Sequence, residues 1–268
     1  MTEEILLYPG CTIPAKLPYL EAASYHVLEK IGAEVLPFPE FSCCFEPVGL
    51  RSLGPDTWLA AGGRLHSLAD GRGMLTLCDG CTLSLHESGA ALGKDSEESQ
   101  ATRELLAELG HSSQPTEIIG LLEFLHARRD ALRNAVSNPQ RLRLFLHPGC
   151  HCEHVCREKG LSAVEMMSAL VADLGAEPVA APEGLCCGSN LTSVRDELGR
   201  KIMGVVLDAA EAAEVDAIVT SCPSCFGQFD VIGRRVPVLH LAEIAAWALG
   251  WELDSASMHR TPLRADSD

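Results

Sequence analysis

The sequence predicts an α/β protein with two similar parallel-sheet domains, and an internal repeat is the main observation behind that prediction. Each half of the 268-residue chain contains a cysteine after a short apolar run, then an adjacent cysteine pair, then a CxxC motif. The spacings are C-x31-CC-x33-CxxC in the first half and C-x35-CC-x34-CxxC in the second. Because these spacings agree within a few residues, they indicate a duplicated unit. Apolar runs alternate with amphipathic segments in both copies, which is typical of βαβ units and a parallel sheet.

The first copy is expected to contain three strands and two helices. Its first apolar run ends in Pro-Gly-Cys, a turn that stops a strand, and Gly32 is placed to end the helix that follows. In chain order, the predicted elements are the strand Ile5–Tyr8, the helix Leu17–Ile31, the strand Glu34–Phe38, the helix Pro55–Ala69 and the strand Met74–Leu77.

The second copy repeats this order, with Gly175 in the place of Gly32. A further strand and helix over Val236–Leu249 are expected to close it. The other predicted elements are the strand Leu142–Leu146, the helix Ala163–Leu174, the strand Glu177–Ala180, the helix Val194–Ala213 and the strand Ala217–Thr220.

Domain boundaries follow from the repeat. Residues 1–95 are predicted to form the first cysteine-rich domain, 96–140 a helical connection, 141–250 the second cysteine-rich domain and 251–268 a polar tail. Within the connection, Arg103–Leu109 and Glu117–Leu132 are expected to be helical, and Val136–Gln140 to be a linker.

Every cysteine group of the repeat follows a predicted strand. In Rossmann-like parallel sheets, ligands gather beyond the carboxyl ends of the strands. The five thiols of each copy are therefore expected at one edge of one sheet, in a position to hold a metal centre.

Composition limits the functional classes. A formal charge of −16 argues against nucleic acid or an anionic membrane as partner, because phosphate binding needs a basic face. No run approaches the roughly 18 apolar residues of a membrane span. The acidic start Met1-Thr2-Glu3-Glu4 is unlike a signal peptide, so we expect a cytoplasmic protein. In that reducing compartment, twelve cysteines favour metal binding or redox catalysis over disulfides.

Three kinds of cysteine site compete. A structural zinc ion takes four ligands, which fits five cysteines per copy poorly. A thioredoxin-like dithiol explains the two CxxC motifs but leaves the other six repeat cysteines without a role. Iron–sulfur clusters are favoured, because thiolates are their standard ligands and a larger or more open cluster would use the fifth thiol.

The two copies resemble the cysteine-rich (CCG) domain found in the B subunit of heterodisulfide reductase, over about residues 5 to 249. The resemblance rests on the duplicated cysteine order and on flanking residues. These are Leu77-Cys78-Asp79-Gly80-Cys81, His147-Pro148-Gly149-Cys150-His151, Cys222-Pro223-Ser224-Cys225, Gln228-Phe229-Asp230 and Pro237-Val238-Leu239-His240.

The resemblance implies two non-cubane [4Fe-4S] clusters. The first would be held by Cys11, Cys43, Cys44, Cys78 and Cys81, and the second by Cys150, Cys186, Cys187, Cys222 and Cys225. A disulfide of the coenzyme M–coenzyme B type, or a protein-bound one, would lie between them and be cleaved in two one-electron steps. Electrons would come from the ferredoxin-like C subunit of the complex, which is fed by the flavin-containing A subunit.

The resemblance also leaves alternatives. Methanogens reduce such a disulfide, whereas sulfur oxidisers carry a similar complex, and related domains serve in electron transfer within lactate- or glycolate-oxidising and quinone-linked complexes. His151 matches a family histidine and is a candidate proton donor to a departing thiolate. The first copy departs from the pattern, with Phe45 where the signature has glycine, and a bulky side chain is expected close to the first cluster.

Two cysteines lie outside the repeat. Cys152 and Cys156 form a dense donor segment with His147, His151 and His154. A second metal site is conceivable there, but a solvated loop beside the cluster is the favoured interpretation. Lys16 could offer charge to an anionic substrate, although a surface lysine is the simpler interpretation.

Overall fold

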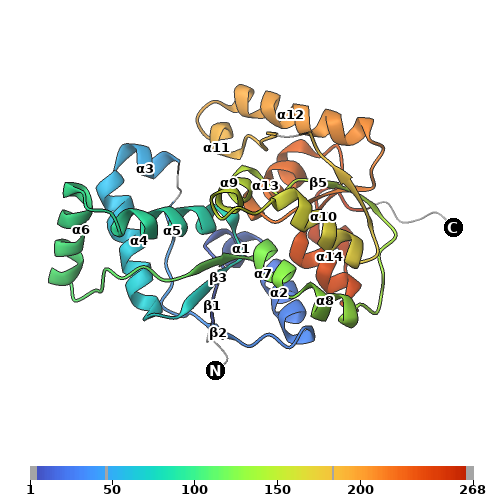
Figure 1. The fold of residues 1–268 in the computed structure, drawn as a ribbon. Coiled ribbons are helices and arrows are strands. Elements are labelled where there is room, and N and C mark those ends of the chain that lie inside the picture. The colour runs from blue at the N-terminus through green and yellow to red at the C-terminus, as the bar shows by residue number, and fades with distance from the viewer. Residues whose placement is uncertain (1–4, 46–47, 183, 264–268) are drawn as a thin grey trace.

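The computed structural model describes residues 5–45, 48–182 and 184–263, and within these it contains two four-stranded parallel sheets. The strand orders are β2-β1-β3-β4 and β6-β5-β7-β8, so the two sheets have the same topology. Figure 1 shows them in two lobes that lie side by side. The predicted α/β fold with two pseudo-repeated parallel sheets is therefore confirmed.

The first sheet is formed by the first half of the chain. The helices and strands of this half are β1 (Ile5–Tyr8), α1 (Thr12–Lys16), α2 (Pro18–Lys30), β2 (Val35–Pro37), α3 (Gly49–Leu53), α4 (Pro55–Ala69), β3 (Gly73–Thr76), α5 (Asp79–Leu92), α6 (Glu97–Glu108), β4 (Ile118–Gly120), α7 (Leu121–Ala127) and α8 (Arg129–Ala135).

The second sheet repeats this plan. Its elements are β5 (Arg143–Leu146), α9 (Cys150–Glu158), α10 (Ala163–Asp173), β6 (Glu177–Ala180), α11 (Ser189–Thr192), α12 (Asp196–Ala212), β7 (Ala217–Thr220), α13 (Pro223–Gly227), the π-helix η1 (Gln228–Gly233), β8 (Val238–His240), α14 (Leu241–Ala248) and α15 (Ser255–Met258).

The predicted helix Glu117–Leu132 is wrong in its first residues, and the structure divides its remainder at Arg128 into α7 and α8. Ile118–Gly120 form strand β4, which pairs with β3 in parallel, with Ile118 opposite Met74, and only then does helix α7 begin. The apolar residues of the strand continue into the apolar face of the helix, so periodicity alone predicts a single helix. Its counterpart in the repeat, β8 followed by α14, has the strand–helix order that we expected there.

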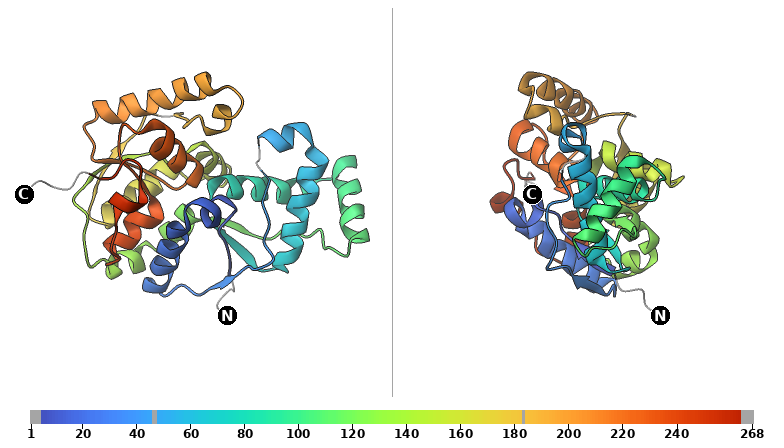
Figure 2. Two further views of the ribbon diagram at one scale, coloured as in Figure 1. Left: turned by 180° about the vertical axis from the view of Figure 1, so that it is seen from behind. Right: turned by 90° about the vertical axis from the view of Figure 1, so that its left-hand side faces the viewer.

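The two copies pack through reciprocal helix pairs. Helix α2 of the first copy packs on α14 of the second, and α10 of the second packs on α7 of the first. Helix α5 likewise packs on α9, and α13 contacts α1. In each case the contact made by a helix of one copy is repeated by the equivalent helix of the other, so the copies are related by an approximate two-fold axis. Figure 2 shows α2 packed against the C-terminal helices, seen from behind. One apolar core contains buried residues of both copies, among them Leu20 and Ile244.

A membrane-crossing segment was not expected from the sequence. Within the described ranges, no helix combines the length and the apolar character that a bilayer span requires.

Candidate metal centre

All ten cysteines of the repeat line one cavity at the junction of the two copies. In each copy the single cysteine follows the first strand, the cysteine pair follows the second and the CxxC follows the third. Because the copies are related by the approximate two-fold axis, the carboxyl ends of the strands of both sheets lie at the junction and face the same cavity. The structure therefore brings together every thiol that the sequence singled out, and it joins the two groups of five into one site.

The Pro-Gly-Cys turns place the first cysteine of each group. Gly10 and Gly149 have φ of 75° and 89°, a left-handed backbone that favours glycine. A Cβ atom on Gly10 would lie 2.9 Å from Sγ of Cys81, and one on Gly149 would lie 3.3 Å from Sγ of Cys225. Glycine is thus needed both for the turn and for the close approach of the CxxC sulfur.

The sulfur atoms within each group lie near one another without being bonded. Sγ of Cys44 lies 3.1 Å from Sγ of Cys81, and Sγ of Cys187 lies 3.2 Å from Sγ of Cys225. A disulfide bond is about 2.0 Å long, and all twelve cysteines are free thiols. Cys11 and Cys43 have their sulfurs 3.8 Å apart, close to the roughly 3.8 Å that separates two thiolates on one tetrahedral metal ion.

Within each group, some cysteines have a lowered pKa and their hydrogen-bonded neighbours have a raised one. The pKa of Cys44 is lowered to about 4, because hydrogen bonding to Cys43 and Cys81 stabilises its thiolate. The pKa of Cys186 is lowered to about 2 for the same reason, chiefly through Cys150. The pKa values of Cys43 and Cys150 are raised in turn by these hydrogen bonds and by burial.

This charge pattern fits a site for metal. Without a cation, crowded buried thiols can form only some of the thiolates, because like charges repel and burial disfavours each one. A metal centre supplies the missing positive charge and deprotonates its thiol ligands outright. Five thiols in each group match the donor chemistry of an iron–sulfur centre.

The two groups meet at the CxxC motifs. A hydrogen bond from Cys78 to Cys222 links them and contributes to a Cys222 pKa well below its usual value, after the larger effect of Cys225. Beside it, Ser221 Oγ donates to Oδ2 of Asp79 at 2.7 Å, and both side chains are buried. The pKa of Asp79 is raised well above its usual value, first by burial and then by the charge of Cys222.

His151, the candidate proton donor, also lies between the groups. It lines the shared cavity, and its Nδ1 would be 3.6 Å from a Cβ atom on Gly80 in the CxxC motif of the other copy. Its charge contributes to lowering the pKa of both Cys44 and Cys222. The imidazole is therefore within electrostatic reach of both cysteine groups.

Phe45 does not occupy the place that the sequence suggested. Its φ is 55°, and the equivalent Gly188 has a φ of 74°, so both follow the cysteine pair in a left-handed conformation. The Phe45 side chain is 36% exposed and lies in an outer groove beside α4 and α6. The expected bulk near the first cluster is therefore directed to the surface, while the backbone keeps the shape of the glycine signature.

The interpretation of Cys152 and Cys156 as part of a solvated loop is wrong. Both lie on helix α9, are buried with exposures of 6% and 4%, and have their sulfurs 3.9 Å apart. The i,i+4 spacing places them on one face of the helix, and that face packs into the shared apolar core. They behave as small apolar side chains.

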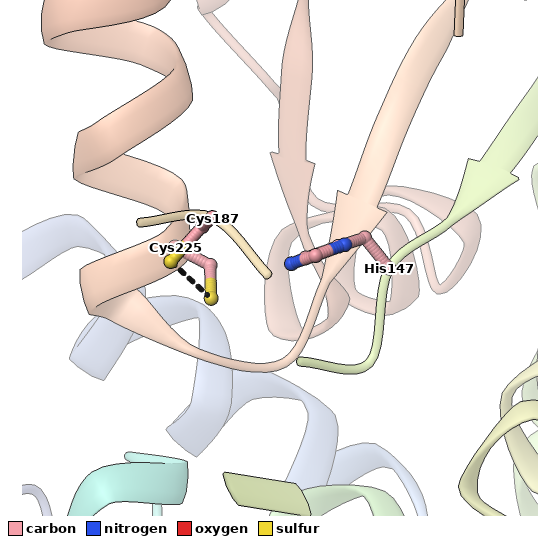
Figure 3. A group of neighbouring side chains, drawn as sticks. All are labelled: His147, Cys187 and Cys225. Atoms are coloured by element: carbon pink, nitrogen blue, oxygen red, sulfur yellow. Dashed lines mark hydrogen bonds between the residues drawn. The ribbon is translucent and has the colours of Figure 1, made fainter. Parts of the chain in front are cut away.

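His147 is a site residue whose position the sequence did not reveal. Its ring is buried and, with Cys187 and Cys225, forms the group of potential metal ligands found among the described residues, with the three ligand atoms within 4.8 Å of one another. Figure 3 shows the imidazole directed toward the two sulfurs from the end of β5. Burial lowers the pKa of His147 to about 4.

A duplicated parallel-sheet scaffold that gathers ten free thiols in one cavity defines a cysteine-rich protein whose thiols form the donor set of a metal site. The chain belongs to the family described as "Cysteine-rich domain", whose model, designated CCG, matches residues 5–86 and 144–230. Each match contains one five-cysteine group.

Two relatives extend this similarity over nearly the whole chain. The chain is 29% identical to the B subunit of the ferredoxin/F420H2-dependent CoB-CoM heterodisulfide reductase of Methanosarcina acetivorans, covering 97% of this chain and 94% of that protein. It is 26% identical to the 8-methylmenaquinol:fumarate reductase membrane anchor subunit of Wolinella succinogenes, covering 93% of each.

A solved structure supports the fold. A hypothetical protein from Helicobacter pylori superposes with a TM-score of 0.72 at 13% identity. The match covers 98% of this chain but only about half, 53%, of that one, and it bears on the fold alone.

Proposed function

We propose that the chain is the catalytic iron–sulfur subunit of a disulfide reductase, holding two [4Fe-4S] clusters of the non-cubane type. The first group would hold one cluster and the second group the other, with the ten cysteines as ligands. The observation that carries the proposal is the single cavity that both groups line, because it would put one substrate in reach of both centres. The similarity to a heterodisulfide reductase protein supports the same assignment.

Two centres suit the chemistry. Reduction of R–S–S–R′ to two thiols consumes two electrons and two protons, and each cluster would supply one electron. The chain itself would position the disulfide between the two clusters and deliver protons. His151 would be the proton donor, a role supported by its electrostatic reach to both groups and by the ability of an imidazole to donate to a departing thiolate.

A neighbouring cavity offers room for the substrate's ends. It has a volume of about 540 Å³ and shares Thr12, Ser189 and Ser224 with the cysteine cavity. Lys16 and Arg260 line it together with Asp230, which leaves a net positive charge there in a chain of net charge −16. These features favour an anionic disulfide, of which the coenzyme M–coenzyme B disulfide is the proposed example.

Partners belong to the proposal as well. The electrons would be delivered by two further subunits, one ferredoxin-like (C) and one flavin-containing (A), since the Methanosarcina relative is itself one lettered component of a larger reductase. The fumarate reductase relative favours a second candidate, in which the chain only relays electrons within a quinone-linked complex. A related sulfur-oxidising complex would use the same cysteine site in the opposite direction.

The first test is metal content. Protein purified without oxygen is expected to contain iron and inorganic sulfide for two clusters and no stoichiometric zinc. Cys187→Ala should lose roughly half of the iron, because one of two equal clusters loses a ligand. Cys156→Ala is the matched control and should keep the full load, because Cys156 packs in the core outside the cavity. Unchanged iron in Cys187→Ala would contradict the ligand assignment.

The second test is turnover. With reduced viologen dye as electron donor, and with the partner subunits added, the protein should reduce the coenzyme M–coenzyme B disulfide. His151→Ala should lower kcat by about 10²–10⁴-fold, the usual contribution of a general acid. Full iron content without reduction of any disulfide would favour the electron-relay role instead.

A further inference from the structure

The two copies carry different side chains at one equivalent position beside their cysteine groups. Tyr8 precedes Pro9-Gly10-Cys11 at the end of β1, and His147 precedes Pro148-Gly149-Cys150 at the end of β5. Both side chains are buried, at 0% and 2% exposure. They differ in hydrogen bonding: the Tyr8 hydroxyl has a partner in the protein, and Nε2 of His147 has none among the described residues.

The polar atom of Tyr8 is satisfied by the protein itself. The hydroxyl donates a hydrogen bond of 2.5 Å to the backbone carbonyl of Ser42. The ring packs against Phe38 and, edge-on, against Phe41. Tyr8 is therefore fully used in holding the segment before the first cysteine pair, and its one donor is not free to bond a cluster.

The polar atom of His147 has no such partner. Its Nε2 is buried, and among the described residues nothing forms a hydrogen bond with it. The backbone N–H of His147 donates to the carbonyl of Val219 at 2.9 Å, which continues the sheet beyond β5. The ring meets Phe229 edge-on at 5.1 Å, and this contact restricts its rotation.

The orientation of the ring points to what would satisfy it. The imidazole lies with the sulfurs of Cys187 and Cys225 in one group of atoms within 4.8 Å of one another (Figure 3). A buried polar group without a partner is rare in folded proteins, so an acceptor that the protein does not itself provide is expected there. Sulfur of a cluster held by these two cysteines would be such an acceptor.

We propose that His147 donates an N–H hydrogen bond from Nε2 to sulfur of the second cluster, and that this bond raises the reduction potential of the second cluster. The inference rests on the proposed function, because it requires a cluster in the second group. A hydrogen bond to cluster sulfur stabilises the more negative, reduced state, and so raises the potential. Tyr8 provides no equivalent bond to the first cluster.

The test is a redox titration followed by electron paramagnetic resonance on the anaerobically purified protein. The signal of the second cluster is the one that Cys187→Ala abolishes. In His147→Phe, which keeps a ring but has no N–H, the midpoint potential of this cluster should shift to a lower value. In His147→Gln, whose amide N–H reaches to a similar distance, the potential should return toward that of the wild type.

Tyr8→Phe serves as the matched control in the first copy, and it should leave the potential of the second cluster unchanged. An unshifted potential in both His147 variants, at full iron content, would overturn the proposal. If His147→Phe does not fold, nitrogen hyperfine coupling in the wild type decides: weak coupling supports a hydrogen bond, and the strong coupling of a nitrogen ligand to iron contradicts it. A wild type without a second cluster would instead refute the proposed function.

Discussion

At the scale of single residues, the position after the cysteine pair shows how one backbone shape accepts two very different side chains. Gly188 and Phe45 both have positive φ, but their surroundings differ. A Cβ atom on Gly188 would lie 2.4 Å from the carbonyl oxygen of Gly199, whereas the side chain of Phe45 is partly exposed. The glycine is therefore required in the second copy and dispensable in the first.

This contrast makes a prediction about stability. Gly188→Ala should lower the free energy of unfolding by about 1–3 kcal/mol or more, because a strained φ and a backbone clash add together. Phe45→Gly should lower it by less than Gly188→Ala does, because relief of left-handed strain partly offsets the greater freedom of the unfolded glycine and the loss of the partly buried ring. Chemical denaturation of the two variants measures both values. Equal effects at the two positions would contradict the argument.

At the scale of secondary-structure elements, a buried histidine joins three segments of the first copy. His66 on α4 has its Nε2 3.0 Å from the carbonyl of Leu85 on α5, and its Nδ1 accepts from the backbone N–H of Thr116 just before β4. Because Nδ1 accepts, the ring must be neutral. Burial lowers the pKa of His66 below its usual value of 6.5.

The sign of the resulting pH dependence follows from this direction. Since the folded-state pKa is lowered, the unfolded chain binds more protons than the folded one as the pH falls below 6.5. The contribution of His66 to stability is therefore full above pH 6.5 and is lost toward lower pH. Denaturant titrations of wild type and His66→Gln from about pH 7.5 to about 5 should show a smaller loss of stability in the variant. Parallel curves would show that His66 is not the titrating group.

At the scale of the whole molecule, the reciprocal helix pairs make the two copies one folding unit. Leu20, Val27 and Leu28 of α2 are fully buried in the core shared with α14. Exposing even a few such side chains costs about 1.5–3 kcal/mol each, a large fraction of the roughly 5–15 kcal/mol that holds a domain folded. Neither copy should be stable without the other.

Fragments 1–140 and 141–268 test this expectation. Expressed separately, each should aggregate or remain unfolded and contain little iron. Expressed together, they should assemble and recover the circular dichroism spectrum and the iron content of the intact chain. A separate fragment that is monomeric, folded and loaded with its own cluster would show that the domains are independent.

Most of the fold could be predicted from the sequence, because the repeat allowed each segment to be checked against its counterpart. Strands β1, β6 and β7 and helix α4 lie where the apolar pattern placed them. Strand β4 was missed, because a three-residue strand followed directly by a helix is too short to show the alternating apolar pattern of a strand. The repeat itself held the missing signal, because β8 and α14 have the same order.

The sequence predicted which cysteines form the candidate site, but not that the two groups of five share one cavity. Cysteines after parallel strands must gather at one edge of a sheet, so each group of five follows from topology. That both groups line one cavity depends on how α2 fits α14 and α5 fits α9, which side-chain shape decides and spacing does not. The same limit applies to His147, whose direction is set by its contact with Phe229.

The unlike pair at the ends of β1 and β5 has a consequence for how a ligand can sit. If the two copies were identical and related by an exact two-fold axis, an unsymmetrical ligand would bind between them equally well in either direction. A tyrosine behind one cysteine group and a histidine behind the other make the two halves unequal, and the equivalent residues on the cavity wall, Thr12 and His151, differ as well. The duplication thus supplies two similar cysteine groups, and the positions at which the copies differ would let an unsymmetrical ligand bind in one direction in preference to the other.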